Sequence, residues 1–257
     1  MASSSQAVPA FVRLAAHPLR WRLLTELAAS DLRVRELMAL VEAPQNLVSY
    51  HLRLLRDGGL VAASRSSFDG RDSYYRLDLE RSAQALAATE AALHPALRRD
   101  AAPSESPAAP QRWPRSAVLF VCTGNSARSP IAEALLRHHT GGRVTARSAG
   151  SRPKPRLHPQ AVQVLRDDYG IDIGEQQPRH LDTLRGRRFN FVITLCDKAR
   201  EVCPEFGDDS RRVHWSIPDP ATAGANEQST HAAFGRAAAD IDKRIHYLLP
   251  VLTTTNT

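Results

Sequence analysis

The stretch that decides the fold is Val121-Cys122-Thr123-Gly124-Asn125-Ser126-Ala127-Arg128-Ser129-Pro130. It follows an apolar run at 117–121 and precedes a segment, 131–137, whose pattern predicts an amphipathic helix. A loop of small residues between a strand and a helix directs backbone N–H groups and the positive end of the helix dipole at one point. We therefore expect this loop to bind an oxyanion, with Cys122 as a nucleophile and Arg128 as a clamp.

The overall composition limits the class of protein. The chain has 257 residues, enough for two modest domains, and it contains no apolar run near the roughly 18 residues that a membrane span needs. Its start lacks the basic and then apolar order of a secretion signal, so we expect a cytoplasmic protein with no membrane partner. The net charge of +7 is diffuse, since residues 1–100 hold 13 arginines against 11 acidic side chains. Charge alone therefore does not argue for nucleic-acid binding.

A predicted linker divides the chain into two domains. Residues 101–115 contain four prolines among small polar residues, a composition that neither a packed helix nor a central strand accepts. The N-terminal domain is then expected to cover residues 1–100, and the C-terminal domain residues 116–257.

The N-terminal domain is predicted to be mainly helical. Helical periodicity predicts four helices, at 18–29, 33–41, 45–57 and 83–92. Segments 60–65 and 73–79 flank a turn at Asp69-Gly70 and predict a β-hairpin. Two helices joined by a tight turn and followed by a hairpin are typical of a winged helix-turn-helix domain, whose second helix enters the major groove of DNA. The last helix is a candidate dimerisation arm.

Polar side chains mark the surface that faces DNA in such a domain. We expect seven residues to contact double-stranded DNA: Gln45, Asn46, Ser49, Tyr50 and Arg53 on the recognition helix, and Arg65 and Arg71 on the wing. The alternative is a small helical domain whose arginines form an ordinary solvated surface.

The segment 49–61 resembles the recognition-helix region of ArsR-type winged-helix repressors, and His17-Pro18-Leu19-Arg20 is similar to the first-helix signature of that family. The resemblance covers roughly residues 10–95 and implies an operator as ligand and a homodimer as the binding form. Repressors of this family that sense arsenite usually carry a cysteine pair on the helix before the recognition helix. Residues 34–41 hold neither cysteine nor histidine, so we expect any inducer to bind elsewhere.

The C-terminal domain alternates predicted strands with helices. Strands are expected at 117–121, 144–148, 189–195 and 213–217, and helices that include 159–169 and 230–249. This alternation predicts an α/β domain with a parallel, doubly wound, four-stranded sheet. The cysteine loop then lies beyond the carboxyl end of the first strand, where such sheets bind their ligands.

Each residue of the cysteine loop has an expected task. Backbone N–H groups surround three oxygens of a tetrahedral oxyanion, and they come from Thr123, Gly124, Asn125, Ser126, Ala127 and Arg128. The same N–H groups lower the pKa of the Cys122 thiol, and Ser129 donates a hydrogen bond to the thiolate. Asn125 is expected in the left-handed conformation, which holds the shape of the loop.

The loop, followed by Ser129-Pro130, resembles that of the low-molecular-weight phosphotyrosine phosphatase superfamily, which includes the thioredoxin-coupled arsenate reductases. Further matches extend the resemblance over about 116–250: Ser148-Ala149-Gly150, His158-Pro159, Gly170-Ile171-Asp172 and Asp219-Pro220. The resemblance implies that Asp219 is the general acid that protonates the leaving oxygen. It implies no tightly bound cofactor, apart from a potassium site of some reductases that would fall on Asn125, Glu133 and Ser148.

The chain has three cysteines, and a redox relay needs all of them. Cys196 and Cys203 stand seven apart after a predicted buried strand, and a plain phosphatase has no use for such a pair. We expect Cys122 to attack arsenate, Cys196 to release arsenite from the Cys122 adduct, and Cys203 to complete a Cys196–Cys203 disulfide. Thioredoxin, glutathione or another thiol then reduces that disulfide. Zinc binding by this pair is a poor alternative, because neither a close Cys-x2-Cys nor a nearby histidine pair is present.

Two further features favour the reductase, and one favours the phosphatase. Thr123 follows the nucleophile as in the arsenate reductases, and no tyrosine follows Asp219-Pro220, whereas Pro130 is typical of phosphatases. The sequence thus predicts an arsenate reductase fused to an ArsR-type transcription regulator of arsenic resistance. Two alternatives stay open: a phosphotyrosine phosphatase with a DNA-binding domain, and a non-catalytic repressor that senses an oxyanion.

Overall fold

The computed structural model describes residues 8–94, 97, 116–206, 210–223 and 226–254. The chain divides into two compact units, Met1–Ala109 and Pro110–Thr257. The predicted linker at 101–115 lies outside the described residues. No described helix combines the length and the apolar character that crossing a membrane requires.

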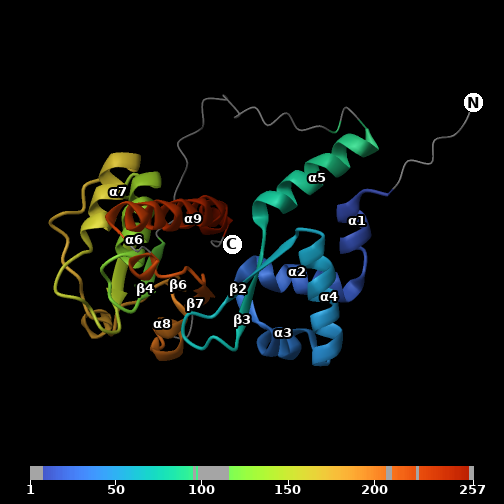
Figure 1. The fold of residues 1–257 in the computed structure, drawn as a ribbon, viewed down its shortest axis with the longest axis horizontal. Helices are drawn as coiled ribbons and strands as arrows, with labels where there is room; N and C mark the ends of the chain where they lie inside the picture. Colours follow the sequence, from blue (N-terminus) through green and yellow to red (C-terminus); the bar gives the residue numbers. More distant parts are fainter. Residues whose placement is uncertain (1–7, 95–96, 98–115, 207–209, 224–225, 255–257) are drawn as a thin grey trace, which may run out of the picture. The chain divides into compact units, whose positions relative to one another are not determined.

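The first unit packs helices against a small antiparallel sheet (Figure 1). Its helices are α1 Ala10–Ala15, α2 Pro18–Ala29, α3 Val34–Val41, α4 Gln45–Asp57 and α5 Leu79–Leu93. Its strands are β1 Leu32–Arg33, β2 Val61–Arg65 and β3 Ser73–Leu77, in the order β1-β3-β2. The helix-turn-helix pair is therefore α3 and α4, and the wing is the hairpin of β2 and β3.

Local signals explain where these helices begin and where the predictions were wrong. His17 caps α2, because its Nδ1 accepts a hydrogen bond from the N–H of Leu19. Helix α5 begins at Leu79, earlier than the sequence predicted, because the Asp78 carboxylate accepts the N–H of Arg81 and caps it there. On α4 the apolar side chain of Leu47 is exposed, whereas His51 is buried.

The second unit is a parallel α/β sheet with the strand order β5-β4-β6-β7. Its strands are β4 Ala117–Cys122, β5 Thr145–Gly150, β6 Phe191–Thr194 and β7 Arg211–His214. Its helices are α6 Arg128–His139, α7 Pro159–Tyr169, α8 Asp197–Val202 and α9 Glu227–Thr254, with short 3-10 turns η2 Leu181–Leu184 and η3 Pro220–Thr222. The predicted doubly wound sheet of four parallel strands is confirmed.

The environment of α6 corrects one expectation. The sequence predicted an amphipathic helix after the cysteine loop, yet every residue from 128 to 136 is buried. The cause is that α6 packs on β4 and β5 on one side and on α9 on the other. Solvent reaches only its last turn. The start of α6 is thereby fixed within the core, which matters because the cysteine loop leads directly into it.

The last strand also differs from its prediction. Strand β7 ends at His214, so the buried residues Trp215 to Ile217 continue beyond the sheet instead of extending it. This non-strand segment starts at the carboxyl edge of the sheet, where β7 ends, and leads to Asp219, the cap of η3.

Candidate active site

The cysteine loop is held by one close backbone approach and one amide side chain. Cys122 pairs with Gly150 in the register of β4 and β5, and a Cβ at Gly150 would lie 2.6 Å from the carbonyl oxygen of Thr123. Asn125 has φ +43°, which confirms the expected left-handed conformation. Its Nδ2 donates to the hydroxyls of Ser129 and Ser148, both at 2.9 Å. These contacts fix the path of the loop before any ligand binds.

Cys122 ends β4 and lies at the base of the loop. Its side chain is almost fully buried, and its Sγ lies 2.9 Å from Oγ of Ser129 in the first turn of α6. The expected contact between Ser129 and the nucleophile is therefore present. Cys122 is thereby in contact with the first turn of α6, the end at which the helix dipole is positive.

Arg128 connects the loop to the segment that carries the expected general acid. Its Nη1 donates to the carbonyl oxygen of Ile217 at 3.0 Å, and its Nη2 forms an ion pair of 3.0 Å with Oδ2 of Asp219. Its Nε is buried and has no hydrogen-bond partner among the residues that the structure describes. A buried N–H without an acceptor is costly, and an oxyanion oxygen is the acceptor that such a donor fits. The structure thus joins Arg128, the first residue of α6 after the cysteine loop, to Asp219.

Cys196 lies beside the same loop. It comes two residues after the end of β6 and occupies the N-cap position of α8, and its Sγ is 3.3 Å from Oγ1 of Thr123. Burial raises the pKa of the Cys196 thiol, while the Arg128 charge and the hydrogen bond from Thr123 oppose that rise. The second cysteine is consequently within reach of the nucleophile's loop but is held as a thiol.

Cys203 lies at the other end of α8. The six-residue helix separates it from Cys196, which corresponds to about 10 Å along the helix axis. A disulfide needs Cα atoms within about 7 Å, so these two thiols cannot join while α8 is intact. Burial raises the pKa of Cys203 to about 11, against the lowering effect of Arg212. The structure therefore brings two of the three cysteines together and keeps the third apart.

A buried polar network that the sequence did not reveal anchors the first turn of α8. Oδ1 of Asp197 accepts a hydrogen bond from Oγ of Ser216 at 2.8 Å and lies 3.1 Å from Nε2 of His214. Nδ1 of His214 lies 2.8 Å from Oγ1 of Thr194. Pairing of β6 with β7 brings the histidine to the aspartate. The sequence held one signal for this network: Asp197 is adjacent to a cysteine that comes just after a predicted buried strand.

The residues expected to bind potassium lie together but do not form a cation site. Ser148 donates its hydroxyl to Oε2 of Glu133 at 2.6 Å, and Gln176 donates to the same oxygen at 2.9 Å. Asn125 presents its NH2 group to Ser148, and its Oδ1 accepts the N–H of Arg179. Potassium needs several oxygens aimed at one point, whereas this cluster satisfies its oxygens internally, so the residues present do not fit the ion.

The seven residues expected to contact DNA fall on α4 and the wing of the first unit. Gln45, Asn46, Tyr50 and Arg53 are exposed, Ser49 is half-buried, and Arg65 and Arg71 are exposed on the hairpin. Nη1 of Arg65 donates to the carbonyl oxygen of Gly70 at 3.0 Å, which stiffens the wing tip. Asp72 pairs with Arg33 and Arg35, at 3.6 and 3.4 Å, and ties the wing to α3.

Comparison with known families assigns both units. The profile described as low molecular weight phosphotyrosine protein phosphatase matches residues 117–256, more than half of the chain. The chain belongs to this family. The profile described as bacterial regulatory protein, arsR family, matches residues 17–63. A phosphatase-family domain is thus fused to an arsR-type helix-turn-helix, as the sequence predicted.

Two arsenate reductases are similar to the phosphatase-family domain over nearly their whole length. The arsenate reductase of Halalkalibacterium halodurans is 36% identical over 131 residues, which cover 51% of this chain and 93% of the relative. That of Bacillus licheniformis is 37% identical over 131 residues, with the same coverage of 51% and 93%. Among solved structures, the thioredoxin-dependent arsenate reductase of Corynebacterium glutamicum is 30% identical, with a TM-score of 0.43 over 56% of this chain and 64% of the other.

Proposed function

We propose that the phosphatase-family domain reduces arsenate to arsenite and that the arsR-type domain binds an operator. The observation that carries the enzymatic part is the position of Cys196, whose Sγ contacts Thr123 in the loop of the nucleophile. A hydrolase needs no second thiol at that place. The names of the relatives, which match over 93% of their length, support the same substrate.

The first step is an attack on arsenic. Arsenate binds to the backbone N–H groups of the loop and to Arg128, whose Nε offers an unused donor. The Cys122 thiolate forms a bond to arsenic, and the bond from arsenic to one oxygen breaks. Asp219, which pairs with Arg128 at 3.0 Å in the free protein, takes up a proton when arsenate replaces it on Arg128, and it gives that proton to the departing oxygen, which leaves as water. The product is a thioester of arsenate on Cys122.

The second step transfers the electrons. Cys196 attacks Sγ of Cys122 and its thiol proton passes to an oxygen of the departing arsenic group. A sulfur–sulfur bond forms, and the sulfur–arsenic bond breaks with its electron pair on arsenic. Arsenic passes from the pentavalent to the trivalent state and leaves as arsenite. Cys203 then attacks Cys196, which releases Cys122 as a thiolate and leaves a Cys196–Cys203 disulfide. The dithiol of thioredoxin returns this disulfide to two thiols.

The second step requires α8 to change. Cys196 and Cys203 cap its two ends, about 10 Å apart, and a disulfide between them requires that residues 197–202 leave the helical path. We propose that formation of the Cys122–Cys196 disulfide pulls Cys196 out of its capping position and so destabilises this short helix.

A steady-state assay tests the enzymatic proposal. Arsenate-dependent oxidation of NADPH, coupled through thioredoxin and thioredoxin reductase, is expected for the full chain and is lost in Cys196→Ser and in Cys203→Ser. Hydrolysis of p-nitrophenyl phosphate serves as the matched readout, since of the three cysteines it needs only Cys122, and it is expected to survive both changes. Loss of both activities in Cys122→Ser completes the pattern. Arsenate turnover that persists in Cys196→Ser contradicts the relay.

A DNA-binding assay tests the regulatory proposal. With an operator obtained by selection from random duplexes, Arg53→Ala is expected to weaken specific binding by about 1–3 kcal/mol. Arg71→Ala, on the wing, is expected to weaken binding to all duplexes and to reduce the salt dependence by about one counterion. Arg81→Ala removes an equal charge from α5 and is the control. We also expect a two-fold symmetric operator and a dimer in light scattering. If neither Arg53→Ala nor Arg71→Ala weakens DNA binding, the proposed surface is contradicted.

A further inference from the structure

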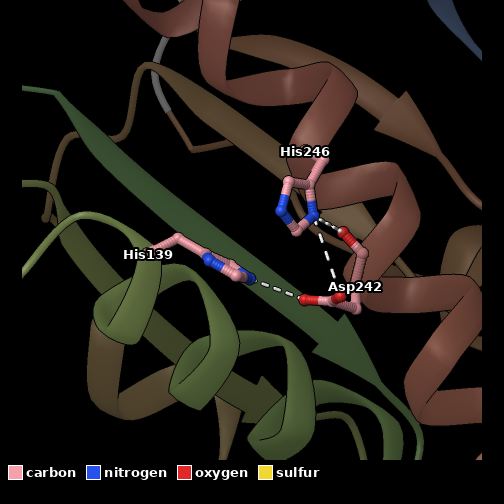
Figure 2. A group of neighbouring side chains, drawn as sticks. All are labelled: His139, Asp242 and His246. Carbon is pink, nitrogen blue, oxygen red and sulfur yellow. Dashed lines mark hydrogen bonds and ion pairs between the residues drawn. The ribbon is translucent and has the colours of Figure 1, made fainter. Parts of the chain in front are cut away.

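Two histidines and an aspartate converge at the end of α6 that is remote from the cysteine loop (Figure 2). Nε2 of His139 lies 2.6 Å from Oδ1 of Asp242, and Nδ1 of His246 lies 3.7 Å from Oδ2 of the same carboxylate. One ring nitrogen from each histidine and one carboxylate oxygen all lie within 4.8 Å of one another. None of these three side chains takes part in the chemistry proposed above.

We propose that His139, Asp242 and His246 form a binding site for a divalent transition metal ion of the zinc type. Two imidazole nitrogens and one carboxylate oxygen are a ligand set that suits zinc, cobalt and nickel, whereas magnesium and calcium prefer oxygen ligands throughout. In a tetrahedral zinc site with bonds of about 2.0–2.1 Å, neighbouring ligand atoms are about 3.3 Å apart. The separations of 2.6 Å from His139 to Oδ1 and of 3.7 Å from His246 to Oδ2 of Asp242 lie on either side of that value. One ligand atom of each residue lies within 4.8 Å of the other two, so side-chain rotations that bring both nitrogens to one carboxylate oxygen complete the geometry.

Regular secondary structure positions the three ligands. Asp242 and His246 are four residues apart on α9 and therefore project from the same face of that helix. His139 is the last residue of α6, and α6 packs against α9. Because both helices are parts of the core, the site needs no ordering of a loop when an ion binds.

The exposure of the cluster fits an ion that arrives from water. The side chains of His139 and Asp242 are 20% and 22% exposed, and that of His246 is 54% exposed. The two inner ligands are therefore oriented by packing, while the outer one can turn to close on the ion. Three protein ligands leave a fourth position for a water molecule.

The two imidazole rings lie against each other as well as against Asp242. The ring centroids of His139 and His246 are 4.4 Å apart, with an angle of 62° between the ring planes. His246 also hydrogen-bonds the carbonyl oxygen of Asp242 through Nδ1, at 3.0 Å, and the ion competes for that nitrogen.

The site has a structural consequence. Helix α6 begins at the cysteine loop and ends at His139, about 18 Å away for its 12 residues. An ion there binds no part of the arsenate site. It joins the last turn of α6 to α9, and it stabilises the domain by an amount that grows with the logarithm of the ratio of ion concentration to dissociation constant.

Calorimetric titration with ZnCl2 tests the site. The protein is the full chain with Cys122, Cys196 and Cys203 replaced by serine, which removes the thiols as competing ligands. We expect one zinc ion per chain and a melting temperature that rises with zinc. His139→Ala, and the isosteric Asp242→Asn, are expected to weaken zinc binding more than tenfold and to abolish the rise. His138→Ala, an exposed neighbour on the same turn, is expected to change neither.

Two outcomes overturn the proposal. One is the absence of saturable zinc binding at one ion per chain. The other is equal loss of binding in His138→Ala and His139→Ala, which indicates diffuse surface histidines. If the cluster is only an ion pair, His139→Ala lowers the melting temperature but zinc has no effect on the parent protein, and this result also counts against the site.

Discussion

Oγ1 of Thr123 lies 3.3 Å from Sγ of Cys196, so the residue that follows the nucleophile contacts the second thiol. Strand β6 delivers Cys196 to this position because it pairs with β4 in parallel and both strands end at the same edge. The third thiol, Cys203, is held away at the far end of α8. The proposed relay therefore depends on how easily α8 opens, and the state of Cys203 reports on it.

Cys203 is predicted to react slowly with alkylating reagents, at a rate that depends strongly on pH. Burial raises its pKa from 9.0 to about 11, so at pH 8 its thiolate fraction is about a hundredfold lower than that of an unperturbed thiol. In the Cys122→Ser/Cys196→Ser variant, the iodoacetamide rate is expected to rise about tenfold per pH unit up to about pH 10. A rate that levels off below pH 9 is inconsistent with a buried, neutral thiol.

Asp197 is predicted to control the opening of α8. Asp197→Ala removes the oxygen that bonds Ser216 and His214, and such a loss in a buried site costs about 2–3 kcal/mol. Hydrogen exchange of residues 197–202 is expected to become faster, and Cys203 alkylation with it. Lys198→Ala, an exposed position on the same helix, is the control and is expected to shift stability by less than about 0.5 kcal/mol. Equal protection of α8 in both variants contradicts the anchoring role.

Asp219 is predicted to act on the leaving group. Asp219→Asn keeps the size of the side chain but has no acidic proton, so hydrolysis of phenyl phosphate is expected to fall about 10²–10⁴-fold. Hydrolysis of p-nitrophenyl phosphate, whose leaving group needs less help from an acid, is expected to fall less. The exposed Asp167→Asn is the control. If the hydrolysis rates of both substrates fall by the same factor in Asp219→Asn, Asp219 acts only through its ion pair with Arg128.

Gly150 is predicted to be indispensable for the shape of the loop. Gly150→Ala places a Cβ 2.6 Å from the carbonyl oxygen of Thr123, and such overpacking costs about 1–3 kcal/mol in urea unfolding. Gly235→Ala, in α9 with open space around the position, is expected to stabilise the domain by up to about 1 kcal/mol. Both activities are expected to fall in the first variant alone, and a fully active Gly150→Ala enzyme would contradict the close approach.

The sequence predicted the helices whose ends carry local signals. Helices α2 and α7 both begin with a histidine cap followed by proline, at His17-Pro18 and His158-Pro159, and Gly170 ends α7 in the left-handed conformation. These signals depend on neighbours in the chain and need no tertiary information. The cysteine loop was predictable for the same reason, since strand, loop and helix start are contiguous.

What the sequence missed depends on contacts between distant residues. The burial of α6 on all sides follows from α9, which begins almost a hundred residues later. Helix α8 has six residues, too few for a periodic pattern. The bonds from His214 to Asp197, and from His139 to Asp242, join residues 17 and 103 positions apart. No local pattern marks such pairs.

A single-turnover reaction tests the central claim most directly. Fully reduced protein is mixed with excess arsenate without thioredoxin, quenched in acid and analysed for arsenite, thiols and disulfides. The relay predicts one arsenite per chain, the loss of two thiols and a Cys196–Cys203 disulfide, and in Cys203→Ser a trapped Cys122–Cys196 disulfide. Three intact thiols and no arsenite, in protein that still hydrolyses p-nitrophenyl phosphate, would show that the domain is a phosphatase and not a reductase.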